Sequence, residues 1–197
     1  GGYARRMGVI NQIRSEEKNV LLFDAGDPPQ GTPYFNFYGG RVEGTALKMM
    51  GYDAVTLGNH EFDNGIDSLV NVLKTAKIDV VNTNFDFSNT PLQPLVQPYK
   101  IIKRGGVKIG VFGLGVNLNG LAFQKNFAGL TLKEPIASAL QTSDYLKNTL
   151  KCDLVICLSH LGVSSLDSTP TDYDLAAAST NIDVIIGGHS HKMLVNE

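Results

Sequence analysis

Four short apolar runs in this sequence each end in polar residues of the kinds that bind metal ions. The polar groups are Asp24-Ala25-Gly26-Asp27, Gly58-Asn59-His60-Glu61, Ser159-His160 and Gly187-Gly188-His189-Ser190-His191. All four histidines of the chain lie in these groups. Open α/β sheets bind ligands where their strands end, so buried strands with such ends predict one shared site. Aspartate, asparagine and histidine side chains together suit a divalent metal ion.

Predicted strands and helices alternate along the chain, which favours an α/β fold with one antiparallel hairpin. Helices are expected over residues 3–17, 43–50, 66–77, 131–150 and 173–178, and strands over 19–23, 54–57, 79–81, 98–104, 107–112, 154–158 and 184–186. The pair Gly105-Gly106 predicts the hairpin turn. Asp67 is expected to cap one helix, and Thr131 with Glu134 has the spacing of a capping box for another. Residues 84–97, rich in Asn, Pro, Gln and Ser, are expected to form a long surface loop.

Length, charge and cysteine content exclude several classes of protein. The 197 residues suit one domain, and 17 basic against 19 acidic residues give a net charge of −2, without the basic excess of a nucleic-acid-binding protein. No apolar stretch approaches the ~20 residues of a membrane-spanning helix. Cys152 and Cys157 bracket a predicted strand, which separates them by about 16 Å, too far for a disulfide. We therefore expect two buried thiols.

Each polar group has a structural explanation when it is taken alone. A single His160 at a strand end is more often a hydrogen-bonded core residue than a ligand, and Asp27 beside a glycine is common in turns. A structural role also explains the two other acidic residues: Asp24 could brace its loop, and Glu61 could cap the following turn. Four such groups in the same context favour a metal site instead. His189 and His191, two apart in an expected extended segment, are predicted to point the same way.

The same residues carry a family resemblance. Four blocks resemble the signatures of the calcineurin-like metallophosphoesterases: Phe23-Asp24-Ala25-Gly26-Asp27, Gly58-Asn59-His60-Glu61-Phe62-Asp63, Ser159-His160 and Gly187-Gly188-His189-Ser190-His191. Two further blocks are similar to the 5′-nucleotidase branch: Gln30-Gly31-Thr32-Pro33 and Gly1-Gly2-Tyr3-Ala4-Arg5. The resemblance implies an α/β fold, a metallophosphoesterase-like β-sandwich flanked by helices in four αββα layers, here lacking the first strand.

The resemblance also implies roles for individual residues. Asp27 would bridge two divalent metal ions. One ion would be completed by Asn59, His160 and His189, and the other would be bound by His191. His60, which is not a ligand, would face the substrate phosphate and be oriented by Asp63, so these two residues are the expected catalytic pair. The ions would be Mn, Zn, Fe or Mg, since the ligand types do not choose among them.

The sequence departs from the family pattern at both ends. The family opens with a strand ending in Asp-x-His, and no such motif occurs here. One ion would then keep only Asp27 and His191, so a single ion is expected in residues 1–197. Relatives also continue into a C-terminal substrate-recognition domain, which is expected to be absent. Residues 1–197 are therefore interpreted as a partial catalytic domain, truncated at both ends, whose activity on its own is in doubt. Relatives are often periplasmic, secreted or attached to the cell surface.

The implied function is metal-dependent hydrolysis of phosphomonoesters by water activated between two metals. The expected substrates are nucleoside 5′-phosphates or other small phosphoesters, with no nucleic acid polymer and no membrane span. Three alternatives stay open: a cyclic-nucleotide phosphodiesterase, a UDP-sugar hydrolase or a sulfur-ester hydrolase on the same core. A protein of another class, a non-catalytic metal-binding or phosphate-binding remnant, is favoured if Gly1 is a natural start. A purely structural α/β domain would make every histidine placement a coincidence.

Overall fold

The computed structural model of the chain describes residues 2–28, 31, 33–164 and 170–194. Its α-helices are α1 (Tyr3–Glu16), α2 (Pro33–Tyr38), α3 (Arg41–Met50), α4 (Gly65–Ala76), α5 (Pro135–Asp144) and α6 (Asp172–Ala178). Two 3₁₀ turns, η1 (His60–Phe62) and η2 (Gln124–Phe127), and a π-helical turn, η3 (Tyr145–Thr149), complete the helical elements. The strands are β1 (Phe23–Asp24), β2 (Ala54–Val55), β3 (Val80–Val81), β4 (Phe85–Asp86), β5 (Val96–Gln97), β6 (Tyr99–Arg104), β7 (Val107–Leu114), β8 (Thr131–Leu132), β9 (Leu154–Ser159) and β10 (Val184–Gly187).

The strands form two sheets of four strands and one small antiparallel pair. The first sheet has the order β1-β2-β3-β5, and all its neighbours run parallel. The second has the order β10-β9-β7-β6, parallel except for the β6–β7 hairpin. β4 and β8 pair separately. The first sheet therefore ends its strands in the Asp27 and Asn59 groups, and the second in the His160 and His189 groups.

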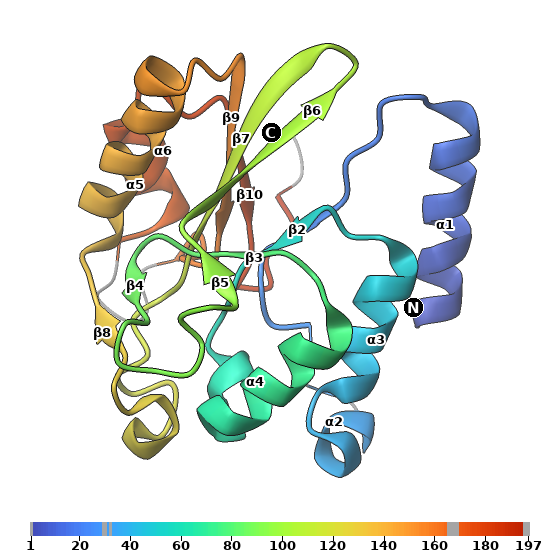
Figure 1. Cartoon of the computed structure of the whole chain (residues 1–197), viewed down its shortest axis with the longest axis vertical. Helices are drawn as coiled ribbons and strands as arrows, with labels where there is room; N and C mark the ends of the chain where they lie inside the picture. The colour runs from blue at the N-terminus through green and yellow to red at the C-terminus, as the bar shows by residue number, and fades with distance from the viewer. Residues whose placement is uncertain (1, 29–30, 32, 165–169, 195–197) are drawn as a thin grey trace.

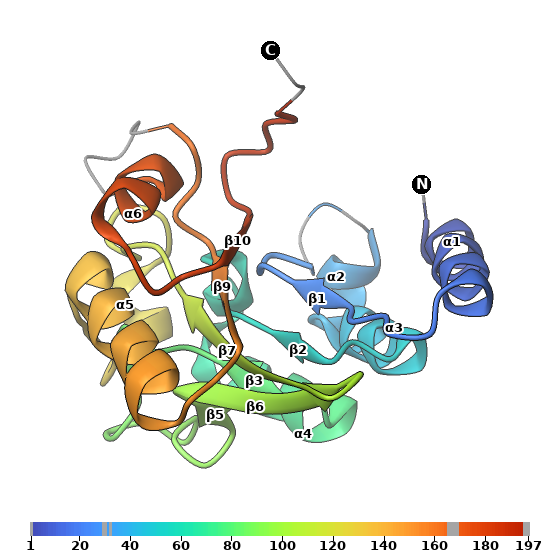
Figure 2. The ribbon, with the colours of Figure 1, turned by 90° about the horizontal axis from the view of Figure 1, so that it is seen from above.

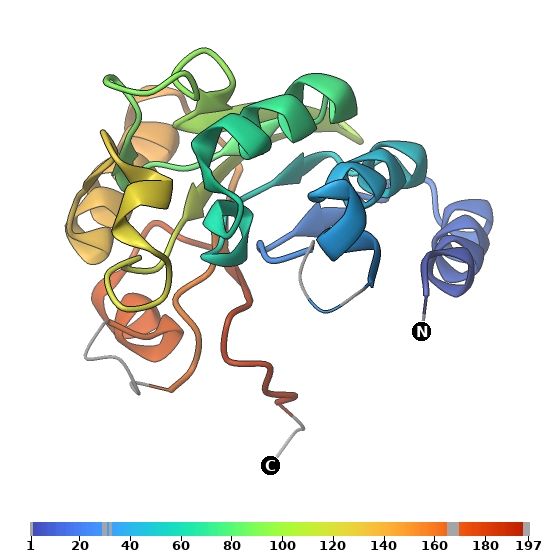
Figure 3. The same cartoon turned by 90° about the horizontal axis from the view of Figure 1, so that it is seen from below.

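Three apolar clusters hold the layers together. One lies between the two sheets, where Ala54 and Val81 meet Val111, Ile156 and Leu158. Another joins the first sheet to α3 and α4, and the last joins the second sheet to α5 and α6. Figures 1 and 2 show α5 and α6 on one side of the sheets and α3 and α4 on the other. Figure 3 shows the same layers from below. The α/β sandwich flanked by helices is thus confirmed.

Local sequence explains where several elements begin and end. Gly105 and Gly106 have φ values of 58° and 84°, which the two-residue turn between β6 and β7 requires, so the hairpin prediction is confirmed. Helix α6 begins with a capping box in which Thr171 and Asp174 exchange hydrogen bonds. Cys152 and Cys157 are buried, and within the described part of the chain both are free thiols.

Two predicted helix caps are wrong. Helix α4 begins at Gly65, before Asp67, and its N-cap Asn64 makes no side-chain cap bond with the described residues. Thr131 lies in β8, and Glu134 itself caps α5 by accepting from the N–H groups of Ile136 and Ala137. Pro135 explains the later start of α5, because proline favours the first position of a helix.

The prediction of a surface loop at residues 84–97 is wrong in part: turns with exposed residues such as Ser88 and Asn89 do connect β4 and β5, but other residues of the segment are buried. Phe85, Phe87 and Leu92 are 4%, 6% and 0% exposed and belong to the cluster under α4. Asn84 is buried too, and its amide bonds both the N–H and the C=O of Gly115. The polar composition of this segment concealed two short strands and a part of the core, because tertiary contacts overrule local composition.

Candidate metal centre

The loops that follow β1, β2, β9 and β10 meet at one place, between the ends of the two sheets. His160 directly follows β9, and its Nδ1 is 2.6 Å from the carbonyl oxygen of Ala25 in the loop after β1. The N–H of Gly188, after β10, donates to the carbonyl of Ser159. Segments far apart in the sequence are therefore joined by direct contacts. The predicted convergence of the four groups occurs.

Asp27 and His160 form the buried centre of this meeting point. His160 Nε2 lies 2.8 Å from Asp27 Oδ2, and the two side chains are 0% and 10% exposed, His160 being the fully buried one. Burial alone would raise the pKa of Asp27, but the hydrogen bond and charge of His160 lower it on balance. Burial alone would lower the pKa of His160, but Asp27 outweighs it and the pKa is raised. Both shifts favour a negatively charged Asp27 beside a protonated His160. A metal ion that binds both side chains must displace the proton between them.

His189 joins Asp27 and His160 in a set of donors that fits a divalent cation, and the nearby loop carries the amide of Asn59. One ligand atom each from Asp27, His160 and His189 lies within 4.8 Å of the others. The His160 and His189 rings are 5.1 Å apart between centroids. Asn59 is 4% exposed, and its Oδ1 has no hydrogen-bond partner among the described residues. A buried acceptor without a donor is costly, and a cation would satisfy it.

His191 is not part of this group. His189 and His191 have φ values of 65° and 51°, and the N–H of Ser190 donates to the Gly188 carbonyl, so the segment is a turn. The prediction that this segment is extended is therefore wrong. His191 does line a surface pocket of about 470 Å³ together with Asp27 and His189. Its role as the ligand of another ion stays a prediction.

His60 and Asp63 lie beside the centre as a hydrogen-bonded pair. The His60 N–H of the main chain donates to Asp27 Oδ1 at 2.8 Å, which places His60 next to the donor set. In the side chains, His60 Nδ1 is 2.7 Å from Asp63 Oδ2, and both are 29% exposed. With Nδ1 held by Asp63, Nε2 is the nitrogen that can meet a ligand.

Close backbone approaches explain the glycines of the motifs. A Cβ on Gly58 would collide with the Asp27 carboxylate and the His160 ring, so only glycine fits there. Asp27 itself has φ 61°, a conformation that non-glycine residues adopt rarely, aspartate more often than most. The burial of Asp24 raises its pKa, and its Oδ1 accepts from the N–H of Gly26, so Asp24 braces the loop.

Glu61 is the residue whose position the sequence did not indicate. Its carboxylate accepts from the N–H of Asp27 at 3.0 Å and from the N–H of Gly58 at 2.7 Å. Burial, followed by the Asp27 charge, raises the pKa of Glu61, whereas the bond from the N–H of Gly58 lowers it because it favours the carboxylate form. These bonds join Glu61 to residues that precede it in the chain, so they differ from the expected capping of the following turn. Adjacency to His60 was the available signal, but sequence spacing does not reveal which loop a side chain reaches.

Almost the whole chain matches a known protein family. Residues 1–193 match the family described as Calcineurin-like phosphoesterase. The chain therefore belongs to the calcineurin-like phosphoesterases, a family of metal-dependent hydrolases. In the two blocks that are similar to the 5′-nucleotidase branch, Gly1, Gln30 and Thr32 lie outside the described residues.

Relatives and solved structures agree on the branch. The chain is 35% identical to a 5′-nucleotidase of Rattus norvegicus, covering 98% of this chain and 33% of that protein. It is 36% identical to an apyrase of Tabanus yao, with 98% and 34% covered. The crystal structure of a 5′-nucleotidase precursor from Thermus thermophilus superposes with a TM-score of 0.89 at 35% identity, covering 100% of this chain and 38% of that one. The chain thus spans about a third of the length of these curated relatives.

One further result concerns membranes. Within the described ranges, helices long and apolar enough to cross a bilayer are absent.

Proposed function

We propose that residues 1–197 form the metal-holding part of a catalytic domain that hydrolyses phosphomonoesters, with nucleoside 5′-phosphates as the substrate class. The observation that carries this proposal is the convergence of Asp27, His160 and His189 within 4.8 Å. Asn59 stands between Gly58 and His60, which both contact Asp27, and its amide oxygen meets no donor among the described residues. The names of the relatives support the substrate class.

The proposed metal ligands are Asp27, Asn59, His160 and His189, with His191 as a ligand of another ion. A divalent cation bound there supplies positive charge to the phosphoryl oxygens and makes a water nucleophilic at neutral pH. Glycine at position 58 and the bond from the His60 main chain hold the Asp27 carboxylate in one orientation. Mn, Zn, Fe and Mg all suit these donors.

His60 is proposed to contact the substrate. Asp63 fixes the ring through Nδ1 and leaves Nε2 to donate to a phosphoryl or leaving oxygen. In the reaction, water adds to phosphorus, the ester P–O bond breaks, and the departing alcohol oxygen gains a proton. A positioned histidine contributes roughly 10²–10⁴-fold to such a step.

Hydrolysis of AMP, p-nitrophenyl phosphate, bis-p-nitrophenyl phosphate and a UDP-sugar by the native-length protein tests the reaction after EDTA treatment and after addition of Mn²⁺. We expect Mn²⁺-dependent turnover of the monoesters, and a loss of roughly 10²-fold or more in His60→Ala. Turnover that is unchanged in His60→Ala would remove the role given to His60. A chain that binds no Mn²⁺ in calorimetry would contradict the metal centre, and Mn²⁺ binding without hydrolysis of any ester would favour a non-catalytic metal-binding module.

A further inference from the structure

The carboxylate of Glu61 joins the two loops that carry the proposed ligands Asp27 and Asn59. Asp27 follows β1, and its main-chain N–H donates to Glu61 Oε1 at 3.0 Å and to Oε2 at 3.3 Å. Gly58 follows β2, and its N–H donates to Oε2 at 2.7 Å. One side chain therefore fixes the main chain at Asp27 and at the residue before Asn59.

A second bond closes this arrangement into a ring. The Asp27 side chain accepts from the main-chain N–H of His60 at 2.8 Å, while the Asp27 main chain donates to the side chain of Glu61. Side chain and main chain thus exchange bonds in both directions between residue 27 and residues 58–61. The main chain at Asp27 holds φ at 61°, its N–H is bound to Glu61, and its carboxylate contacts His160, so the bond to Glu61 bears on the placement of that carboxylate.

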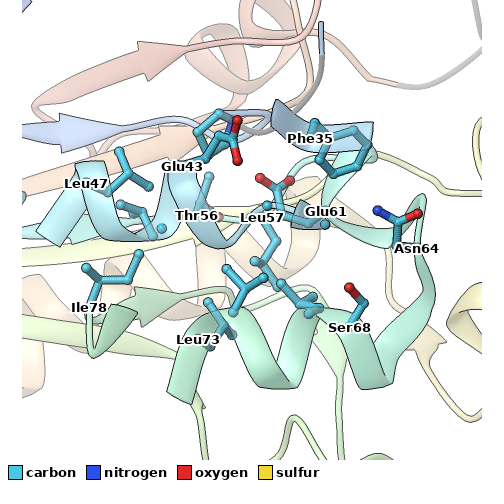
Figure 4. Close-up of a pocket in the computed structure, with 17 residues that line it drawn as sticks. Phe35, Glu43, Leu47, Thr56, Leu57, Glu61, Asn64, Ser68, Leu73 and Ile78 are labelled. Atoms are coloured by element: carbon cyan, nitrogen blue, oxygen red, sulfur yellow. The ribbon is translucent and has the colours of Figure 1, made fainter. Parts of the chain in front are cut away.

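The side chain of Glu61 reaches this place along a mainly apolar cavity. The cavity has a volume of about 40 Å³ and lies between α3, α4 and the first sheet. Figure 4 shows the Glu61 carboxylate near Phe35 and Glu43, above the leucines Leu57 and Leu73. Hydrogen bonds in apolar surroundings are stronger than the same bonds in water. The walls therefore favour one position for the Glu61 carboxylate.

We propose that Glu61 is a positioning residue, whose main-chain hydrogen bonds set the relative placement of the Asp27 carboxylate and the Asn59 amide and so determine the affinity for a divalent cation. Glu61 does not itself ligate the ion. The inference rests on the proposed function only for the presence of that ion, and it does not depend on the substrate.

Glu61→Gln is the variant that tests this role. A carboxylate accepts with both oxygens, whereas a glutamine offers one oxygen and turns an NH₂ group toward one of the donors. We expect Glu61→Gln to weaken Mn²⁺ binding in isothermal titration calorimetry by roughly 10–100-fold, as the loss of residues that orient metal ligands does elsewhere. We also expect faster amide hydrogen exchange at Asp27 and Gly58, measured by NMR on the metal-free protein.

Glu134→Gln provides the matched control. Glu134 is also a carboxylate that accepts from two main-chain N–H groups, those of Ile136 and Ala137, but it caps α5 away from the centre. We expect the Mn²⁺ affinity of Glu134→Gln to stay close to that of the wild type. Leu73→Ala, which enlarges the same cavity without touching the carboxylate, shows whether lost stability alone weakens binding.

The outcomes separate this inference from the proposed function. An unchanged Mn²⁺ affinity in Glu61→Gln would overturn the positioning role, as would an equal loss of affinity in Leu73→Ala. A wild type that binds Mn²⁺ but hydrolyses no phosphoester would contradict the proposed function and leave the expected loss in Glu61→Gln as the test of Glu61. A wild type that binds no Mn²⁺ would contradict both.

Discussion

Asn84 and Asn59 are both buried, but only the amide oxygen of Asn84 has a hydrogen-bond donor among the described residues. Asn84, 2% exposed, bonds both main-chain groups of Gly115 at 2.8 Å. Asn59 is 4% exposed, yet its Oδ1 meets no donor among the residues that the structure describes. An unsatisfied buried polar group costs about 1–3 kcal/mol, so Asn59 lowers stability at a place where its oxygen is proposed to meet the metal.

The contrast between these asparagines leads to a first prediction. Asn59→Leu removes an acceptor that has no donor among the described residues, so we expect the free energy of unfolding of the metal-free protein to change by less than ~1 kcal/mol. Mn²⁺ affinity should fall by roughly 10-fold or more, because an amide ligand is lost. Asn84→Leu, the control, leaves two main-chain groups of Gly115 without partners and should lose about 2 kcal/mol or more in urea denaturation. Equal stability losses in the two variants would contradict this account.

The His60–Asp63 pair gives a second prediction at this scale. Asp63→Asn preserves the size of the side chain but removes the negative charge that holds Nδ1 of His60. We expect kcat for AMP to fall by roughly 10–100-fold, because the ring is no longer oriented, with Mn²⁺ affinity unchanged. Asp86→Asn, on a partly exposed residue of β4, should leave kcat as it is. A kcat for Asp63→Asn equal to that of the wild type would show that Asp63 does not orient His60.

At the level of elements, very short strands deliver the site residues. β1 and β2 pair over two residues each, and the chain then leaves the sheet for the loops that carry Asp27 and Asn59. The predicted strands over 19–23 and 54–57 overlap β1 and β2 but were too long. Their pairing is limited because each loop turns toward the other, with Gly58 packed against both Asp27 and His160.

Gly58 therefore has a predicted mutational effect of its own. The added methyl group of Gly58→Ala would overlap the Asp27 carboxylate and the His160 ring, and overpacking of this kind costs about 1–3 kcal/mol. We expect that loss in urea denaturation, together with weaker Mn²⁺ binding. Gly8→Ala is the control, since a Cβ on Gly8 in helix α1 meets open space. It should stabilise the protein by up to ~1 kcal/mol, and a Gly58→Ala variant as stable as the wild type would refute the close packing.

For the whole molecule, the proposed centre lies where the two sheets end, and its ligands come from both. Asp27 and Asn59 follow the first sheet, while His160 and His189 follow the second. A bound ion would join layers that otherwise meet through the apolar cluster between the sheets. Unfolding of either sheet would then release the ion.

This linkage predicts a stability effect of metal removal. At free Mn²⁺ about 100 times its dissociation constant, we expect the free energy of unfolding to rise by about 2.7 kcal/mol, since the ion binds only the folded state. Thermal unfolding with EDTA and with Mn²⁺ measures the difference as a shift in Tm. Identical Tm values would mean that the proposed ligands do not hold an ion. The stoichiometry from calorimetry reports whether a second ion binds through Asp27 and His191.

The sequence by itself determined the α/β class, the hairpin at Gly105-Gly106 and which four groups meet, because strands alternate with helices and polar residues follow the apolar runs that form the strands. It did not determine the helix caps, the burial of Phe85 and Leu92, or the turn at His189 and His191, since these depend on contacts between distant segments. Only the tertiary structure decided that Glu61 reaches back to Asp27 and Gly58. The reason is physical: a side chain bonds the groups that lie near it in space, and the sequence spacing of Glu61 carries no information about the loop after β1.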